Sequence, residues 1–174
     1  MTIAIQESSP TIKAEAPKIL AEIKKAKSVL LHCHPSPDPD SVGSALAMKF
    51  ALESMGKNVT VIRGDNEIPT AFMHFPGAGD IVAKNFFEVN LADFALFIIQ
   101  DSGSTNQISK LNPVVFPLPV RTVVIDHHAS NPGFADVNLI DSTIPATTQV
   151  LYELFTLWKV KITPEIAANL FIGM

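Results

Sequence analysis

Residues 28–41, SVLLHCHPSPDPDS, decide the fold, because they pass from a buried strand into a polar loop and then into a helix. The apolar run over residues 28–33 is typical of a strand inside a parallel sheet. A loop rich in proline and aspartate follows, as expected where a rigid strand presents functional side chains. Ser41 is predicted to open a helix that ends at Gly56.

Three further apolar runs predict strands. They are residues 58–63 (NVTVIR), 94–100 (FALFIIQ) and 121–125 (RTVVI). The spacing of apolar residues predicts further helices over residues 10–27, 147–158 and 164–172. Together these elements indicate an α/β fold, a doubly wound and mainly parallel sheet flanked by helices, in one domain over residues 1–174. Polar clusters follow three of the strands, and we expect them to converge on one crevice at the carboxyl ends.

The composition restricts the class of function. Hydrophobic residues make up 47% and charged residues 17% of the 174 residues, as in globular proteins. The net charge of -4 argues against broad duplex binding, although bound metals can attract a small anionic substrate. Cys33 is the single cysteine, so a disulfide within the chain is excluded. With no signal-peptide pattern and no apolar run of roughly 18 residues, we predict a cytoplasmic protein without a membrane partner.

The first polar cluster contains His34, Asp38 and Asp40. An imidazole and two carboxylates suit Mn²⁺ or a related divalent ion. In an extended loop the two aspartates would point the same way, and a cation between them would remove their repulsion. A proline-stiffened surface turn with solvated aspartates is the alternative. His32 and Cys33 are expected to be strand residues rather than ligands.

The second and third clusters follow later strands. Asp101 comes directly after FALFIIQ and is either a metal ligand or the N-cap of a helix. The triplet Asp126, His127 and His128 follows TVVI. Adjacent side chains diverge, so one histidine can bind a metal while the other faces a substrate phosphate. Two histidines satisfied within a loop would fit the same sequence.

The three clusters together, HPSPDPDSVGS, QDSG and DHHASN, occur in an order that resembles the DHH phosphoesterase superfamily. The likeness is strongest to its RecJ-like branch of oligoribonucleases and 3′-phosphoadenosine 5′-phosphate phosphatases. It implies metal-dependent hydrolysis of phosphodiester or phosphomonoester bonds, with two Mn²⁺ ions or another divalent ion such as Mg²⁺. The implied substrate is a small nucleotide or a short single-stranded oligonucleotide, and a homodimer is compatible with the resemblance.

The resemblance also implies roles for individual residues. It implies five metal ligands, which are His34, Asp38, Asp40, Asp101 and His127, with Asp101 bridging the two ions. His128 would face the scissile phosphate, and Asp126 would orient a ligand histidine.

The sequence departs from the family pattern at its end. Members continue from a segment like NLFIGM into an Asp-Thr-Gly motif and a C-terminal substrate-binding domain, and neither occurs in this sequence. The resemblance therefore implies an incomplete N-terminal domain whose second metal site is short of one carboxylate, with weak or no turnover. A manganese-dependent pyrophosphatase or exopolyphosphatase and a non-catalytic metal- or nucleotide-binding module are the alternatives.

Overall fold

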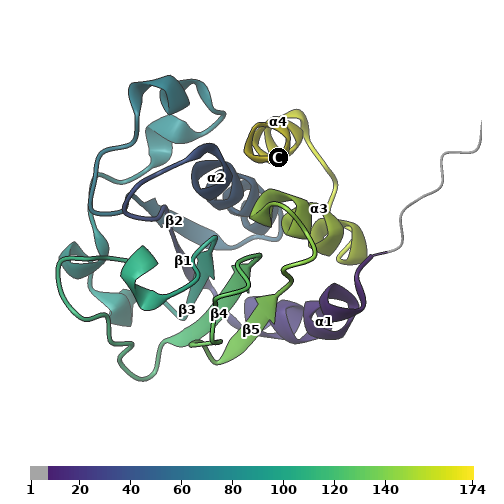
Figure 1. Ribbon diagram of the computed structural model, residues 1–174, viewed down its shortest axis with the longest axis horizontal. Coiled ribbons are helices and arrows are strands. Elements are labelled where there is room, and N and C mark those ends of the chain that lie inside the picture. The colour runs from purple at the N-terminus through teal and green to yellow at the C-terminus, as the bar shows by residue number, and fades with distance from the viewer. Residues whose placement is uncertain (1–7) are drawn as a thin grey trace, which may run out of the picture.

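The computed structural model describes residues 8–174 as a parallel sheet with α-helices packed against it (Figure 1). The five strands have the order β2-β1-β3-β4-β5. Their bounds are β1 Ser28–His32, β2 Asn58–Ile62, β3 Leu96–Gln100, β4 Arg121–Asp126 and β5 Val137–Ile140. Every neighbouring pair is parallel. The predicted α/β fold with a parallel sheet is confirmed.

Three of the four α-helices begin with a side-chain cap. Their bounds are α1 Pro10–Lys25, α2 Pro39–Ser54, α3 Thr147–Leu157 and α4 Pro164–Gly173. Ser9, Asp38 and Thr163 cap α1, α2 and α4 through their side chains, and proline follows each of them. A proline there costs no hydrogen bond, because the first amides of a helix have no partner within it.

The start of α2 corrects one expectation. The helix begins at Pro39 and not at Ser41, and Asp38 is its N-cap. Asp40 therefore lies in the first helical turn, so Asp38 and Asp40 do not share the extended loop in which they were predicted to point the same way. A proline at the first helical position, preceded by aspartate, is the start signal that the sequence carried.

The two faces of the sheet are covered differently. The four α-helices share one core with the side chains of Val29, Leu31, Ile98 and Val123. The other face, which presents Leu30, Phe97 and Val124, is covered by loops and short 3-10 helices that contribute residues such as Phe86 and Ile108. The three central strands, β1, β3 and β4, are buried apart from the first residue of β1 and of β4, as their continuous apolar sequences predict.

The strand β5 was not predicted. It extends the sheet beside β4, with Val123 in register with Val137 and Asp126 with Ile140. Only Leu139 of its four residues is buried, so it lacks the continuous apolar run that marked the central strands. No helix within residues 8–174 is long and apolar enough to cross a bilayer.

The strand order places a crevice next to β1. The chain moves from β1 outward to β2, and then crosses back to β3, β4 and β5 on the other side. The loops that leave β1 and β3 therefore run in opposite directions and separate at the carboxyl edge of the sheet. Ligands of open α/β sheets bind at such a switch point.

Helix α4 packs closely on α2 through glycine. A Cβ built on Gly43 would lie 2.6 Å from the carbonyl oxygen of Asn169, a distance that real Cβ contacts do not reach. The same helix ends at Gly173, where a Cβ would overlap Cγ2 of Thr148. These two contacts set α4 against the start of α2 and the start of α3.

We expect Gly43→Ala to lower the free energy of unfolding by up to about 2 kcal/mol, measured by urea denaturation. The methyl group forces the two helices apart, at a cost of about 1–3 kcal/mol for overpacking. This exceeds the gain of about 1 kcal/mol from replacing glycine in a helix.

Gly79→Ala is the matched control, because a Cβ there meets no atom within 4 Å. Its free energy of unfolding should stay within about 0.5 kcal/mol of the wild type. Equal stability of the two variants would contradict the close packing of α2 on α4.

Candidate metal centre

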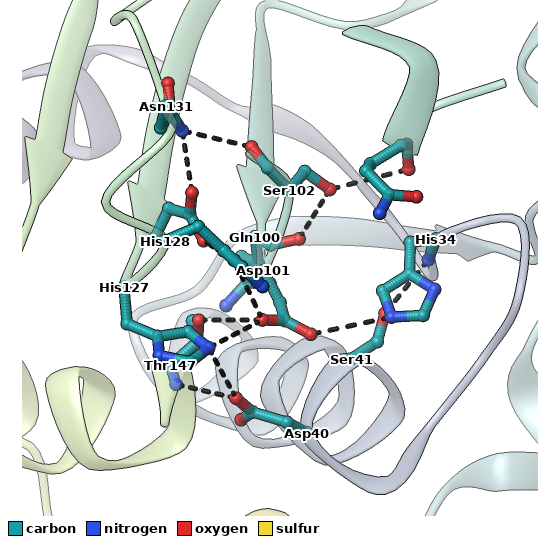
Figure 2. Close-up of polar contacts among 12 residues, drawn as sticks. His34, Asp40, Ser41, Gln100, Asp101, Ser102, His127, His128, Asn131 and Thr147 are labelled. Atoms are coloured by element: carbon teal, nitrogen blue, oxygen red, sulfur yellow. Dashed lines mark hydrogen bonds and ion pairs between the residues drawn. The ribbon is translucent and has the colours of Figure 1, made fainter. Parts of the chain in front are cut away.

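Six of the predicted site residues line one pocket at the carboxyl edge of the sheet. They are His34, Asp38, Asp40, Asp101, His127 and His128. They come from the loops after β1, β3 and β4 and from the start of α2. Figure 2 shows five of them, His34, Asp40, Asp101, His127 and His128. The cavity measures about 480 Å³ and is also lined by Ser36, Gln107, Pro145, Ala146, Gly173 and Met174.

Asp101 lies between two histidines. Its Oδ2 is 3.6 Å from His34 Nε2, and its Oδ1 is 3.5 Å from His127 Nε2, so each carboxylate oxygen faces a different imidazole (Figure 2). The residue is buried and adopts a positive φ of 50°, which turns the chain sharply at the end of β3. Aspartate tolerates this left-handed conformation better than most residues.

The alternative in which Asp101 caps a helix is wrong. The 3-10 helix that follows it, Thr105–Gln107, has Ser104 at its N-cap position. The side chain of Asp101 instead accepts a hydrogen bond from Thr147 Oγ1 at 3.2 Å.

Asp38 both caps α2 and faces His34. Its Oδ1 accepts from Ser41 N at 2.9 Å, and its Oδ2 lies 3.3 Å from His34 Nε2. Burial alone would raise the pKa of Asp38, but the hydrogen bonds with His34 and Ser41 lower it below its ordinary value. Ser41 Oγ also accepts from the amide of His34, which ties the loop to the helix.

Asp40 is bound by the first turn of α3. Its two oxygens accept from Thr147 N at 2.7 Å and from Thr148 N at 2.8 Å. The N-cap residue of α3, Ala146, has no side chain that can do this, so Asp40 supplies the missing acceptor from another helix. His127 Nε2 lies 3.8 Å away. Sequence reasoning missed Thr147, because nothing local marks a contact across more than one hundred residues.

The two adjacent histidines do not diverge as expected. Their ring centroids are 4.4 Å apart, and the planes are tilted by 50°. The chain leaves the extended conformation after Asp126, the last residue of β4, so the alternation of a strand no longer applies. Both rings face Asp101, with His128 Nδ1 at 3.9 Å from its Oδ1.

Asp126 holds His128 in place. His128 Nδ1 donates to Asp126 Oδ1 at 2.7 Å, so Asp126 contacts the histidine that was predicted to face the phosphate. Asn131, which sequence reasoning missed, donates from Nδ2 to Asp126 Oδ2 at 2.7 Å and to the carbonyl of Ser102 at 3.1 Å. The asparagine thereby links the loops after β3 and β4. The sequence signal for Asn131 was its place at the end of the DHHASN cluster.

His32 and Cys33 do not line the pocket. His32 is the last residue of β1 and Cys33 follows it, and both are buried. Burial lowers the pKa of His32 to about 3 and raises that of Cys33 to about 12. Neither group carries a charge at neutral pH, as expected for residues in the interior.

The electrostatics of the pocket oppose the charged form of Asp101. Burial, followed by the charges of Asp40 and Asp38, raises the pKa of Asp101 to about 7. For His128, burial lowers the pKa, but the hydrogen bond to Asp126 and the nearby carboxylates raise it above its ordinary value overall. A cation near Asp38, Asp40 and Asp101 would relieve the repulsion between these carboxylates, as a bound proton does.

The donor atoms fit a divalent cation. Two groups have ligand atoms within 4.8 Å of one another, namely Asp101 with His127 and His128, and His34 with Asp38 and Asp101. Because Asp101 is common to both groups, its two oxygens are placed to serve two ions. Imidazole nitrogen and carboxylate oxygen suit Mn²⁺ and its neighbours.

Comparison with known protein families gives a match over most of the chain. The DHH family, N-terminal domain, matches residues 28–174. The bifunctional oligoribonuclease and PAP phosphatase NrnA of Thermus thermophilus is 28% identical over 166 residues, covering 92% of this chain and 47% of the relative. The protein of the same name from Bacillus subtilis is 24% identical over 140 residues, covering 79% and 41%. The chain spans about half the length of these curated relatives.

Two solved structures share the fold. An exopolyphosphatase-related protein from Bacteroides fragilis superposes with a TM-score of 0.82 at 24% identity, covering 93% of this chain and 49% of that one. RecJ from Thermus thermophilus, solved in complex with Mn²⁺, gives a TM-score of 0.56 at 16% identity, covering 94% and 24%.

The metal-free protein should lose stability as the pH rises. Folding raises the pKa of Asp101 from 3.8 to about 7, so the folded protein binds this proton more tightly. The stabilising contribution is complete below about pH 4 and is lost as the pH passes about 7. We expect the free energy of unfolding, measured in urea with a chelator, to fall between about pH 4 and about pH 7.

Asp101→Asn provides the control, because an amide has no proton to lose. Its profile should be flatter over the same range, and Mn²⁺ should stabilise the wild type more at about pH 8 than at about pH 5. Parallel profiles for the two proteins would show that Asp101 is not the group responsible.

Proposed function

Because the chain belongs to the DHH family, as its N-terminal domain over residues 28–174, we propose that it is a metal-dependent phosphoesterase domain. The proposed reaction is hydrolysis of phosphodiester or phosphomonoester bonds in short oligonucleotides or small nucleotides. The observation that carries the proposal is Asp101, whose two oxygens face His34 and His127 on opposite sides.

In this proposal His34, Asp38 and Asp101 hold one cation, and Asp40, Asp101 and His127 hold the second. The bound cations would lower the pKa of a water molecule and neutralise charge on the phosphoryl oxygens. Asp38 and Asp40 are fixed by α2 and α3 through backbone amides, so these ligands do not need to be ordered when a cation binds.

His128 is proposed to bind the substrate phosphate. Its Nδ1 is engaged by Asp126, which leaves Nε2 as the nitrogen available to a ligand. Because the pKa of His128 is raised, its protonated form persists to a higher pH, and this form donates from both nitrogens. A hydrogen bond from Nε2 to the transferring phosphate would stabilise its developing charge.

The proposed substrate class rests on the curated relatives. Two of them are named bifunctional oligoribonuclease and PAP phosphatase. PAP is 3′-phosphoadenosine 5′-phosphate, a small nucleotide with two phosphate groups. The cavity of about 480 Å³ is in the range of small-molecule sites. Pyrophosphate and polyphosphate are the competing substrates, and binding without hydrolysis is the competing function.

The test is a substrate panel with Mn²⁺, run on the full-length protein and containing short oligoribonucleotides, 3′-phosphoadenosine 5′-phosphate, pyrophosphate and polyphosphate. We expect hydrolysis of one of the first two, its loss on chelation, and its loss in Asp101→Ala and His127→Ala by at least about 100-fold. His74→Ala is the matched histidine control, because His74 is exposed and lies outside the pocket.

Retention of activity in His127→Ala would contradict the site assignment. Hydrolysis restricted to pyrophosphate or polyphosphate would contradict the proposed substrate class. Tight Mn²⁺ binding without hydrolysis of any substrate would favour a binding module over an enzyme.

A further inference from the structure

The segment of residues 64–66 follows β2 and contacts the two loops that carry metal-site residues. It has no role in the site as described so far, and it does not line the pocket. Because β1 lies between β2 and β3, the segment reaches past β1 to contact the loop that leaves β3.

The first contact is with the loop after β1. Gly64 lies against the backbone of His34, and a Cβ built there would be 2.6 Å from both the carbonyl carbon and the carbonyl oxygen of His34. Two residues later, Asn66 Nδ2 donates to the carbonyl of Pro35 at 2.5 Å. A side chain larger than hydrogen at Gly64 would push away the loop that carries His34 and Asp38.

The second contact is with the loop after β3. The carboxylate of Asp65 accepts from Ser109 Oγ at 2.6 Å and from the amide of Lys110 at 2.6 Å. Ser109 is buried, so loss of this acceptor would leave its hydroxyl poorly satisfied. The loop that Asp65 holds begins at Asp101 and contains Gln107, a lining residue of the pocket.

We propose that Asp65 is a positioning residue for the metal centre. Together with Gly64 and Asn66 it fixes the loop of His34 relative to the loop of Asp101. The distance between His34 and Asp101 decides whether both can ligate one cation. Asp65 sets this distance from outside the pocket. This inference rests on the proposed function, since it concerns the metal site on which that function depends.

Hydrogen-bonding partners outside the ligand shell typically change metal affinity by about 10- to 100-fold when they are removed. A residue that merely stabilises a surface loop would change the free energy of unfolding without changing the metal affinity of the protein that remains folded. Metal affinity, measured apart from stability, therefore separates the two roles.

The experiment compares Asp65→Ala with Asp136→Ala. Asp136 likewise accepts one amide and one hydroxyl hydrogen bond at the opposite end of the sheet, from Thr122 N at 2.8 Å and Thr122 Oγ1 at 3.0 Å. It also forms an ion pair with Arg121 at 2.8 Å. Mn²⁺ affinity is measured by calorimetric titration, and unfolding by urea in a chelator. We expect Asp65→Ala to weaken Mn²⁺ binding by about 10-fold or more and Asp136→Ala by less than about twofold.

Ser109→Ala removes the hydroxyl donor without changing the charge. We expect it to weaken Mn²⁺ binding in the same direction as Asp65→Ala, by a smaller factor. If Asp65→Ala weakens Mn²⁺ binding and Ser109→Ala does not, the effect would be assigned to the charge of Asp65. This result would overturn the positioning role.

Other outcomes are equally decisive. Unchanged Mn²⁺ affinity in Asp65→Ala, with normal binding by the wild type, would overturn the positioning role and leave the proposed function intact. Equal weakening by Asp65→Ala and Asp136→Ala would assign both effects to general stability and would also overturn it. Failure of the wild type to bind Mn²⁺ would overturn the proposed function and the inference together.

Discussion

The crowding of carboxylates around Asp101 is the constraint on which the rest of the site depends. Asp101 is buried, and the charges of Asp40 and Asp38 add to the cost of ionising it, so its pKa rises to about 7. Carboxylates this close together are stable only when a proton, a hydrogen-bond donor or a cation compensates their charge. The fold supplies backbone-amide donors for Asp38 and Asp40, whereas Asp101 accepts a longer hydrogen bond from Thr147 Oγ1.

Helix starts supply those donors. Asp38 caps α2, and Asp40 accepts the first two amides of α3, so both carboxylates lie where the helix dipole favours negative charge. Gly173 brings the end of α4 against the same region, because a side chain there would meet Thr148 and Asp40. Asp38 and Asp40 are thus held by the packing of α2, α3 and α4.

The sequence predicted what depends on local pattern. The central strands were recognised from continuous apolar runs, and the clusters at their ends converge because parallel strands end at the same edge. The start of α2 was placed two residues late, which put Asp40 in an extended loop and not in the first helical turn. β5 was missed because it is half exposed, and the contacts of Thr147, Asn131 and Asp65 were missed because each joins segments that are distant in the chain.

Bound cations would make this acidic pocket compatible with a phosphate ligand. Among the lining residues that the structure describes there is no lysine or arginine, whereas three aspartates are present. A phosphate entering this pocket would meet like charges in a partly buried environment, where Coulomb repulsion is stronger than in water. Bound cations would reverse the sign of the field at that point. The same arrangement would make substrate affinity depend on the metal, because the described lining residues include no lysine or arginine.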